Sequence, residues 1–135
     1  MDVALTSYQG PPNVTIIRAA GIFDASATED FMVPTRKAIE SGTENILLDL
    51  CEVSFMSSIG IRVINAIYFE LHPRESKEKD KEIALKVREG DYKAPHLKIL
   101  CPQQNVHKVM EMVGIDQYIE IFEDEDQALA AFKDK

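Results

Sequence analysis

Apolar stretches alternate along the chain with segments of helical spacing, and the clearest such pair lies at its centre. Residues 46–50 are apolar except for Asp49, which favours a strand covered on both faces. Ser57 and Ser58 follow at the position expected for a helix N-cap. The next apolar residues recur at helical spacing, at Ile61, Ile64, Ile67, Tyr68 and Leu71. The pattern predicts a strand, a turn and a helix, with two hydroxyls at the positive end of the helix.

The part of the chain before this centre predicts a hairpin and a helix. Apolar and polar residues alternate on both sides of a Gly-Pro-Pro turn, over residues 3–8 and 13–20. Ser26 and Glu29 match a capping box, which predicts a helix that begins there. Pro34 lies inside the helical pattern that follows and would remove a hydrogen bond. The pattern therefore predicts either a kink or a helix that begins near Pro34.

Two further strand and helix pairs are predicted after residue 95. A strand over 97–101 precedes a helix that Pro102 would open and Gly114 would cap. A last strand over 118–122 precedes a helix that opens in the acidic run 123–126, whose charge we expect to complement the helix dipole. This order of elements predicts a mostly parallel α/β sheet with one antiparallel pair at or near an edge.

Residues 72–95 differ in character from the rest of the chain. Residues 74–82 are almost entirely charged, with both signs interspersed. Such a run buries too little apolar surface to offset the entropy of ordering it. The composition predicts a solvated, flexible insertion, and an arm that docks a partner is the alternative.

Length and charge narrow the possible partners and location. The 135 residues are sufficient for a single domain spanning 1–135, and 15 basic against 23 acidic residues give a net charge of −8. This charge repels nucleic acid and anionic membranes. The sequence has neither a secretory signal pattern nor an apolar run long enough to span a membrane, so we expect a cytoplasmic protein.

Motifs for catalysis, metals and cofactors are missing from the sequence. It contains no GxSxG elbow, P-loop, HExxH or dinucleotide fingerprint. Cys51 and Cys101 lack CxxC spacing, so we expect ordinary reduced thiols, and the three histidines lie far apart in the sequence. A serine-nucleophile enzyme would need a positioned base, and no such residue is evident. We therefore predict no enzymatic activity, no cofactor and no metal.

The serine turn and its surroundings resemble the STAS domain, the sulphate-transporter and anti-sigma-factor-antagonist family. The resemblance rests on residues 48–64 around Ser57-Ser58-Ile59-Gly60, on Gly21-Ile22-Phe23-Asp24, on residues 109–116 and on the ending 122–132. It covers nearly the whole chain. It implies a mixed sheet of about five strands with helices mainly on one face.

The resemblance also implies a function. Family members that stand alone commonly act as anti-sigma-factor antagonists, which bind a serine kinase that otherwise holds a sigma factor. That kinase phosphorylates a serine at the start of the helix after the third strand, and a phosphatase can reverse the step. By motif this serine is Ser58, with Ser57 as the alternative, and Ser57 stands where the family usually has Asp. The implied partner-binding residues are Asp24, Ser57, Ser58, Ile59, Gly60 and Arg62.

A phosphate at this turn would act on a partner more than on the fold. A phosphoserine adds a charge of about −1.5 to −2, which a helix N-terminus tolerates. Arg62 lies one helical turn after Ser58, where it is either a plain exposed helix residue or a cation that reaches back toward Ser58. An interface that buries the unmodified hydroxyl would have to desolvate this charge. The alternative function is an unphosphorylated scaffold or ligand-sensing STAS domain that recruits a partner through residues 72–95.

Overall fold

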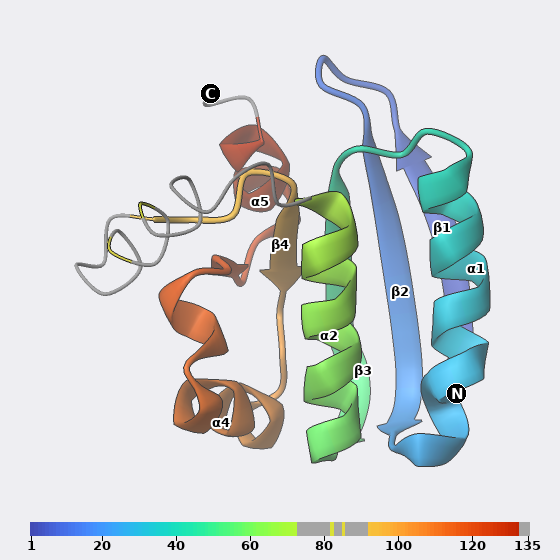
Figure 1. Cartoon of the computed structure of the whole chain (residues 1–135), viewed down its shortest axis with the longest axis vertical. Coiled ribbons are helices and arrows are strands. Elements are labelled where there is room, and N and C mark those ends of the chain that lie inside the picture. Colours follow the sequence, from blue (N-terminus) through green and yellow to red (C-terminus); the bar gives the residue numbers. More distant parts are fainter. Residues whose placement is uncertain (73–81, 83–84, 86–91, 133–135) are drawn as a thin grey trace.

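Five strands form one mixed sheet in the order β1-β2-β3-β4-β5 (Figure 1). The computed structural model describes residues 1–72, 82, 85 and 92–132. The hairpin strands β1 and β2 pair antiparallel, and all other neighbours pair parallel. The strands are β1 (Asp2–Tyr8), β2 (Val14–Phe23), β3 (Ile46–Met56), β4 (Leu97–Leu100) and β5 (Ile121–Phe122). This confirms the predicted α/β class, the opening hairpin and the mixed sheet.

The helices are unequally divided between the two faces of the sheet. In the ranges that the structure describes, the helices with assigned bounds are α1 (Thr28–Glu40), α2 (Ser58–Leu71), α4 (Gln104–Val113) and α5 (Glu125–Ala131), with short 3-10 turns η1 (Ala25–Ala27) and η2 (Ile115–Gln117). Residues of α1, α2 and α4 join the larger hydrophobic core on one face, whereas α5 packs in a smaller core on the other. Helices therefore cover mainly one face, as predicted.

Alternation along the central strands supplies both cores. Ile17 of β2 lies beside Leu48 of β3 and both contribute to the larger core, while the adjacent pair Ile16 and Leu47 contributes to the smaller one. Leu47 and Leu48 are both fully buried. The apolar run at the start of β3 is thus explained by a strand covered on both sides.

Asp49, the single charge in that run, is held by an ion pair on the α5 face. Its Oδ2 accepts from the Arg18 guanidinium at 3.0 Å, and its Oδ1 accepts from the backbone N–H of Cys51 at 3.0 Å. Arg18 also contacts Glu125 of α5 at 3.1 Å. Because the Arg18 side chain is half-exposed, these pairs contribute orientation between β2, β3 and α5 more than stability.

The start of α1 differs from the predicted capping box. Asp24, not Ser26, caps this region: its Oδ1 accepts from the backbone N–H of Ser26 at 3.1 Å and from the Ser26 hydroxyl at 2.7 Å. A 3-10 turn follows, and α1 begins at Thr28 without a side-chain cap. The helix runs through Pro34, so the prediction of a start near Pro34 was wrong. The proline ring is accommodated because the surrounding helix is held by its buried face.

Several other strand and helix boundaries differ from the predicted ones. β3 continues to Met56, past the predicted end at Leu50, because the extended β2 supplies a parallel partner as far as Phe23. β5 contains only Ile121 and Phe122 of the predicted strand 118–122, since Tyr118 is the C-cap of η2 and the chain joins the sheet only after residue 120. Helix α4 begins at Gln104, after Pro102 and not with it, and Gly114 ends it in the left-handed conformation with φ of 82°. Asp124 caps α5 by accepting from Gln127 N–H at 3.1 Å, as predicted from the acidic run.

The predicted insertion 72–95 lies mostly outside the described residues. The structure describes only His72, 82, 85 and 92–95 of it. Its predicted flexibility, and its alternative role as a docking arm, therefore stay predictions.

The structure describes both cysteines, and its described residues bear on metal-binding groups and membrane-spanning helices. Cys51 and Cys101 are half-buried free thiols, and burial raises the pKa of the Cys51 thiol. Over the described ranges, no group of His, Cys, Asp and Glu residues is arranged to hold a metal ion. None of the helices described in the structure combines the length and apolar character of a membrane span.

Two histidines that are far apart in the sequence lie together near the end of α2. The Nδ1–H of His72 donates to the carbonyl of Tyr68 at 2.8 Å, because a carbonyl can only accept. His72 Nε2 accepts from the backbone N–H of His96 at 3.1 Å, and His96 Nδ1 contacts Asn45 Oδ1 at 2.9 Å. This network needs a neutral His72. Burial, together with nearby His96 and Lys98, lowers the His72 pKa to about 4.

We therefore expect stability to fall on mild acidification. Unfolded His72 takes up a proton near pH 6.5, whereas the folded protein resists it down to about pH 4. The stabilisation of the folded state by neutral His72 is complete above about pH 6.5 and is lost as the pH falls toward 4. After allowance for the partial exposure of His72, the free energy of unfolding should decrease by about 2 kcal/mol over this range. Urea unfolding across this range measures the loss. A His72→Gln variant should lose this part of the pH dependence, and an unchanged slope would contradict the assignment.

Candidate functional site

The predicted serine turn lies at the carboxyl ends of β2 and β3, where α2 begins. The backbone N–H of Ser57 donates to the Phe23 carbonyl at 3.0 Å, and the Ser57 hydroxyl reaches the same carbonyl at 3.3 Å. Ser57 Oγ also accepts from the Ile59 N–H at 3.2 Å, which makes Ser57 the N-cap of α2. The Ser57 side chain therefore ties the helix start to the end of β2 and is committed to that structural role.

Ser58 is the first residue of α2 and is exposed. In the described part of the chain, no residue forms a hydrogen bond with its side chain. Its hydroxyl stands at the helix N-terminus, where unpaired backbone N–H groups and the helix dipole favour negative charge. Of the two predicted serines, Ser58 has the hydroxyl that is accessible to a partner.

Asp24 lies at the same end of the sheet, next to the carbonyl that Ser57 binds. The hydrogen bond from the Ser26 hydroxyl holds the pKa of the Asp24 carboxyl below its usual range. Because the carboxylate caps η1, the residue fixes the loop from β2 to α1 beside the serine turn. The structure thus brings the predicted residue Asp24 together with Ser57 through Phe23.

Arg62 is exposed, four residues after Ser58 on the same helix. Residues four apart in a helix lie on one face, so the guanidinium can extend toward the first turn. No salt bridge joins Arg62 to another of the described residues. Arg62 therefore places a cation one helical turn from an anion at Ser58.

Ile59 and Gly60 shape the first turn of α2 from beneath. Ile59 is half-buried against the larger core, and Gly60 is buried. A Cβ added at Gly60 would stand 2.6 Å from Met56 Cγ and 3.2 Å from the Phe23 ring. The absence of a side chain lets α2 pack closely onto β2 and β3 at this point.

We expect Gly60→Ala to destabilise the protein by about 1 kcal/mol. The overlap with Met56 and Phe23 costs about 1–3 kcal/mol, and the higher helix propensity of alanine returns about 1 kcal/mol. Urea unfolding of the variant measures the balance. A variant more stable than wild type would mean that the Met56 side chain yields freely and that close packing does not hold the turn.

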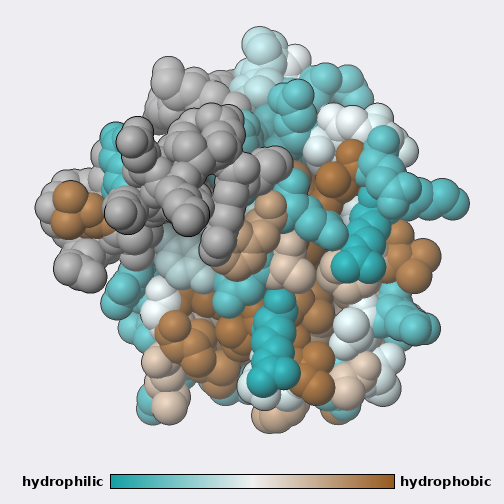
Figure 2. Space-filling model, viewed as in Figure 1, coloured by the Kyte–Doolittle hydropathy of each residue, from teal (hydrophilic) through white to brown (hydrophobic). Residues whose placement is uncertain are grey.

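The surface around the turn is partly hydrophobic. Figure 2 shows apolar side chains gathered where Figure 1 draws the beginning of α2 and α4. Met112 and Val113, at the end of α4, are 80% and 56% exposed. At its other end α4 is tied to β3, because Asn105 Nδ2 donates to the Ser54 carbonyl at 2.8 Å. The beginning of α4 therefore lies beside the end of β3, from which the serine turn follows.

Sequence reasoning missed a second apolar pair at this end of the sheet. Ile22 and Phe55 are register partners on β2 and β3, and their side chains are 54% and 51% exposed. The predicted β3 ended before Phe55, so its position on a strand was not evident. The alternation of exposed Glu52 and Ser54 with buried Val53 was the available signal.

The groups beside the turn bear on whether either serine could act as a nucleophile. Asp24 follows Phe23, whose carbonyl accepts a hydrogen bond from Ser57, and the Asp24 carboxylate already caps η1. No histidine has been placed within reach of Ser58 by any described contact. A serine nucleophile needs a base that accepts its proton, and the hydrogen bonds of the Ser57 hydroxyl to described residues are to the Phe23 carbonyl and the Ile59 N–H.

Comparison with known proteins identifies a family and a fold. Residues 6–77, more than half of the chain, match the family model of the STAS domain. An anti-sigma factor antagonist from Mycobacterium paratuberculosis aligns with a TM-score of 0.72 at 14% sequence identity, over 98% of this chain and 96% of that protein. Unphosphorylated SpoIIAA, an anti-sigma factor antagonist, aligns with a TM-score of 0.67 at 21% identity, over 96% of each chain.

The phosphorylated form of SpoIIAA from Bacillus also aligns. Its TM-score is 0.59 at 20% identity, over 94% of this chain and 97% of that protein. At such identities the likeness shows a shared fold. No curated protein matches the sequence significantly.

Proposed function

The chain belongs to the STAS domain family, and from that premise we propose that it is a regulatory binding module of the anti-sigma-factor-antagonist type. It binds a partner serine kinase that acts as an anti-sigma factor, and phosphorylation of Ser58 by that kinase switches the binding off. A phosphatase restores the unmodified form. The role requires no catalysis and no cofactor of its own, and its setting is the cytoplasm.

The observation that carries the proposal is that the two serine side chains have different contacts. Ser57 uses its hydroxyl to cap α2 and to contact the Phe23 carbonyl, whereas Ser58 is exposed at the first helical position. A kinase needs a hydroxyl that it can reach, and only Ser58 offers one at this turn. The phosphorylated form of the related fold SpoIIAA supports the same type of switch.

The electrostatics of the turn favour a phosphate on the free protein. The N-terminus of α2 stabilises negative charge by about 0.3–1 kcal/mol when exposed, and Arg62 lies one turn away. The modified protein therefore keeps its fold. The penalty falls on a complex that would bury the phosphate, because desolvating a dianion costs several kcal/mol.

The partner surface in this proposal consists of Asp24, Ser57, Ser58, Ile59 and Arg62, with Gly60 shaping it from beneath. Exposed Phe55, two residues before Ser57, adds apolar area beside this surface. Apolar side chains around a polar centre are typical of protein interfaces. The net charge of −8 further favours a partner with a basic surface.

Intact-mass spectrometry after incubation with a candidate serine kinase and ATP tests the assignment. Wild type should gain one phosphate, and Ser58→Ala should gain none. Ser57→Ala is the matched control: it loses a cap, which costs about 1 kcal/mol, but should still be phosphorylated. Phosphorylation of Ser58→Ala together with loss in Ser57→Ala would assign the switch to Ser57 and overturn the proposal.

A further inference from the structure

A polar cavity lies at the end of the sheet opposite the serine turn. It has a volume of about 410 Å³, within the range of about 300–1,000 Å³ that small-molecule pockets span. One wall is the β1–β2 turn and the other is the loop that joins α1 to β3, residues 41–45. Both walls stand at the beginning of β2 and β3, whereas Ser57 follows the end of β3 (Figure 1). The cavity is separate from the proposed partner surface.

The floor of the cavity is fixed by hydrogen bonds between the two walls. Thr15 Oγ1 and Thr43 Oγ1 lie 3.1 Å apart, and Asn45 Nδ2 donates to the carbonyl of Asn13 at 3.2 Å. The backbone N–H of Thr15 donates to the Asn45 carbonyl at 2.9 Å. Asn45 itself is only 4% exposed. The polar groups are therefore preorganised, which reduces the entropy lost when a ligand binds.

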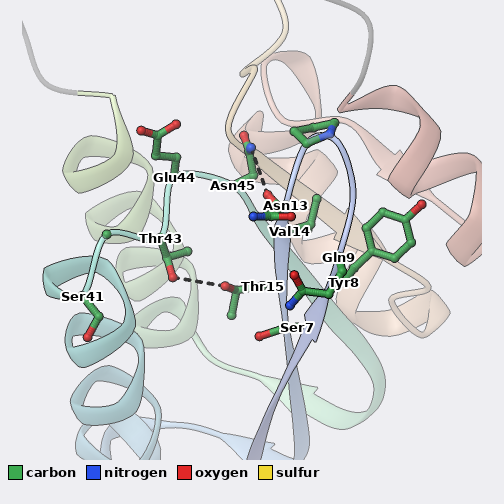
Figure 3. Close-up of a pocket in the computed structure, with 12 residues that line it drawn as sticks. Ser7, Tyr8, Gln9, Asn13, Val14, Thr15, Ser41, Thr43, Glu44 and Asn45 are labelled. Atoms are coloured by element: carbon green, nitrogen blue, oxygen red, sulfur yellow. Dashed lines mark hydrogen bonds between the residues drawn. The ribbon is translucent and has the colours of Figure 1, made fainter.

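Several of these groups keep hydrogen-bonding capacity. A hydroxyl has one donor and two acceptor positions, and in the Thr15–Thr43 pair only one of the two hydroxyls donates to the other. Ser7 and Gln9 line the same cavity, and no described residue forms a hydrogen bond with either side chain. Figure 3 shows the hydroxyls of Ser7 and Thr15 turned toward the space in front of Thr43. Donors and acceptors from three segments thus converge.

The lining is almost uncharged. Among the described residues that line it there is no Lys, Arg or His, and their single carboxylic acid, Glu44, points away from the Thr15–Thr43 pair in Figure 3. The ring of Tyr8 also turns away, toward the smaller core. A phosphate or nucleotide would find no counter-charge here, and an aromatic ligand would find no stacking partner. Mixed hydroxyl and amide groups match a ligand that carries its own hydroxyls.

We propose that this cavity binds a small, uncharged polyhydroxylated ligand, of the sugar or cyclitol class. Each ligand hydroxyl can donate to one side chain and accept from another, which satisfies the open positions at Thr15, Thr43 and Ser7. The site is independent of the phosphorylation switch, so either proposal can fail without the other.

The test is a titration of the isotope-labelled protein followed by its amide NMR signals, with glucose, trehalose and myo-inositol as neutral probes. Inorganic phosphate and spermidine are the charged probes. At least one neutral probe should produce saturable shifts at Thr15, Thr43 and Asn45. Failure of all three neutral probes to do so, or saturable binding of phosphate or spermidine at these amides in their place, would overturn the proposal.

Two variants and one control assign the binding to the cavity. Thr43→Val and Ser7→Ala should each weaken binding of the active probe by about two- to tenfold, the equivalent of one hydrogen bond. Thr6→Val, an exposed strand threonine outside the cavity, should leave it unchanged. Ser7 is exposed on β1, so its variant keeps the fold even if Thr43→Val does not. Wild-type affinity in Ser7→Ala and Thr43→Val would contradict the site.

Discussion

Replacing Ser58 with aspartate is expected to weaken binding of the partner kinase by about 100-fold. The carboxylate is tolerated in the free protein, because it stands at the N-terminus of α2 near Arg62. In the complex it must lose its hydration, and a loss of about 2.7 kcal/mol corresponds to 100-fold in affinity. Isothermal titration of the kinase against both proteins measures the effect.

Two further variants show whether the effect belongs to this position. Ser58→Ala keeps an uncharged side chain and should bind within a few-fold of wild type. Ser7→Asp places the same charge on an exposed β1 residue at the other end of the sheet, and should also bind normally. A comparable loss in Ser7→Asp would trace the effect to net charge, and wild-type affinity for Ser58→Asp would remove the switch.

Phe23→Ala is expected to lower the free energy of unfolding by about 3–5 kcal/mol. The side chain is fully buried, its ring centroid lies 5.0 Å from that of Phe31, and it packs beneath Gly60. Its removal leaves a cavity where η1, α1 and α2 meet the sheet. Because the Phe23 carbonyl also holds Ser57, the same cavity should loosen the serine turn.

Phe55→Ala is the matched control for this stability prediction. Phe55 has the same side chain on the neighbouring strand, but it is 51% exposed. Its loss should cost less than about 1 kcal/mol, while it removes apolar area from the surface near the turn. Urea unfolding compares the two variants, and equal losses would mean that Phe23 does not anchor the site.

The central strand and helix could be predicted because their signals are local. The apolar run of β3 has one charge, and the period of α2 begins directly after two serines. A run covered on both faces and a helix N-cap each leave a pattern within a few residues. The position of Ser58 at a helix start could therefore be predicted from the sequence. That the Ser58 hydroxyl is exposed, while the Ser57 hydroxyl is hydrogen-bonded, became known only from the structure.

The start of α1 was mispredicted because two capping patterns overlap. Ser26 and Glu29 match a capping box, but Asp24 lies two residues earlier and its carboxylate binds both the backbone and the hydroxyl of Ser26. A carboxylate accepts stronger hydrogen bonds than a hydroxyl does, so the earlier cap prevails. The sequence contains both patterns. Which of them caps the helix depends on where β2 ends, and the sequence alone does not fix that position.

Contacts between distant segments left no pattern in the sequence. His72 and His96 meet because α2 ends beside the segment that enters β4. The polar cavity joins the hairpin turn to residues 41–45 for the same reason, since β2 and β3 start side by side. Both features depend on strand register, which becomes known only when the sheet is assembled.

The central claim is tested most directly by the affinity of the partner kinase for the enzymatically phosphorylated protein, compared with the unmodified protein. We predict that one phosphate, located on Ser58 by peptide mapping, weakens binding at least as much as Ser58→Asp, and that phosphatase treatment restores it. Equal affinity of the two forms, or a phosphate found elsewhere with the same effect, would contradict the account.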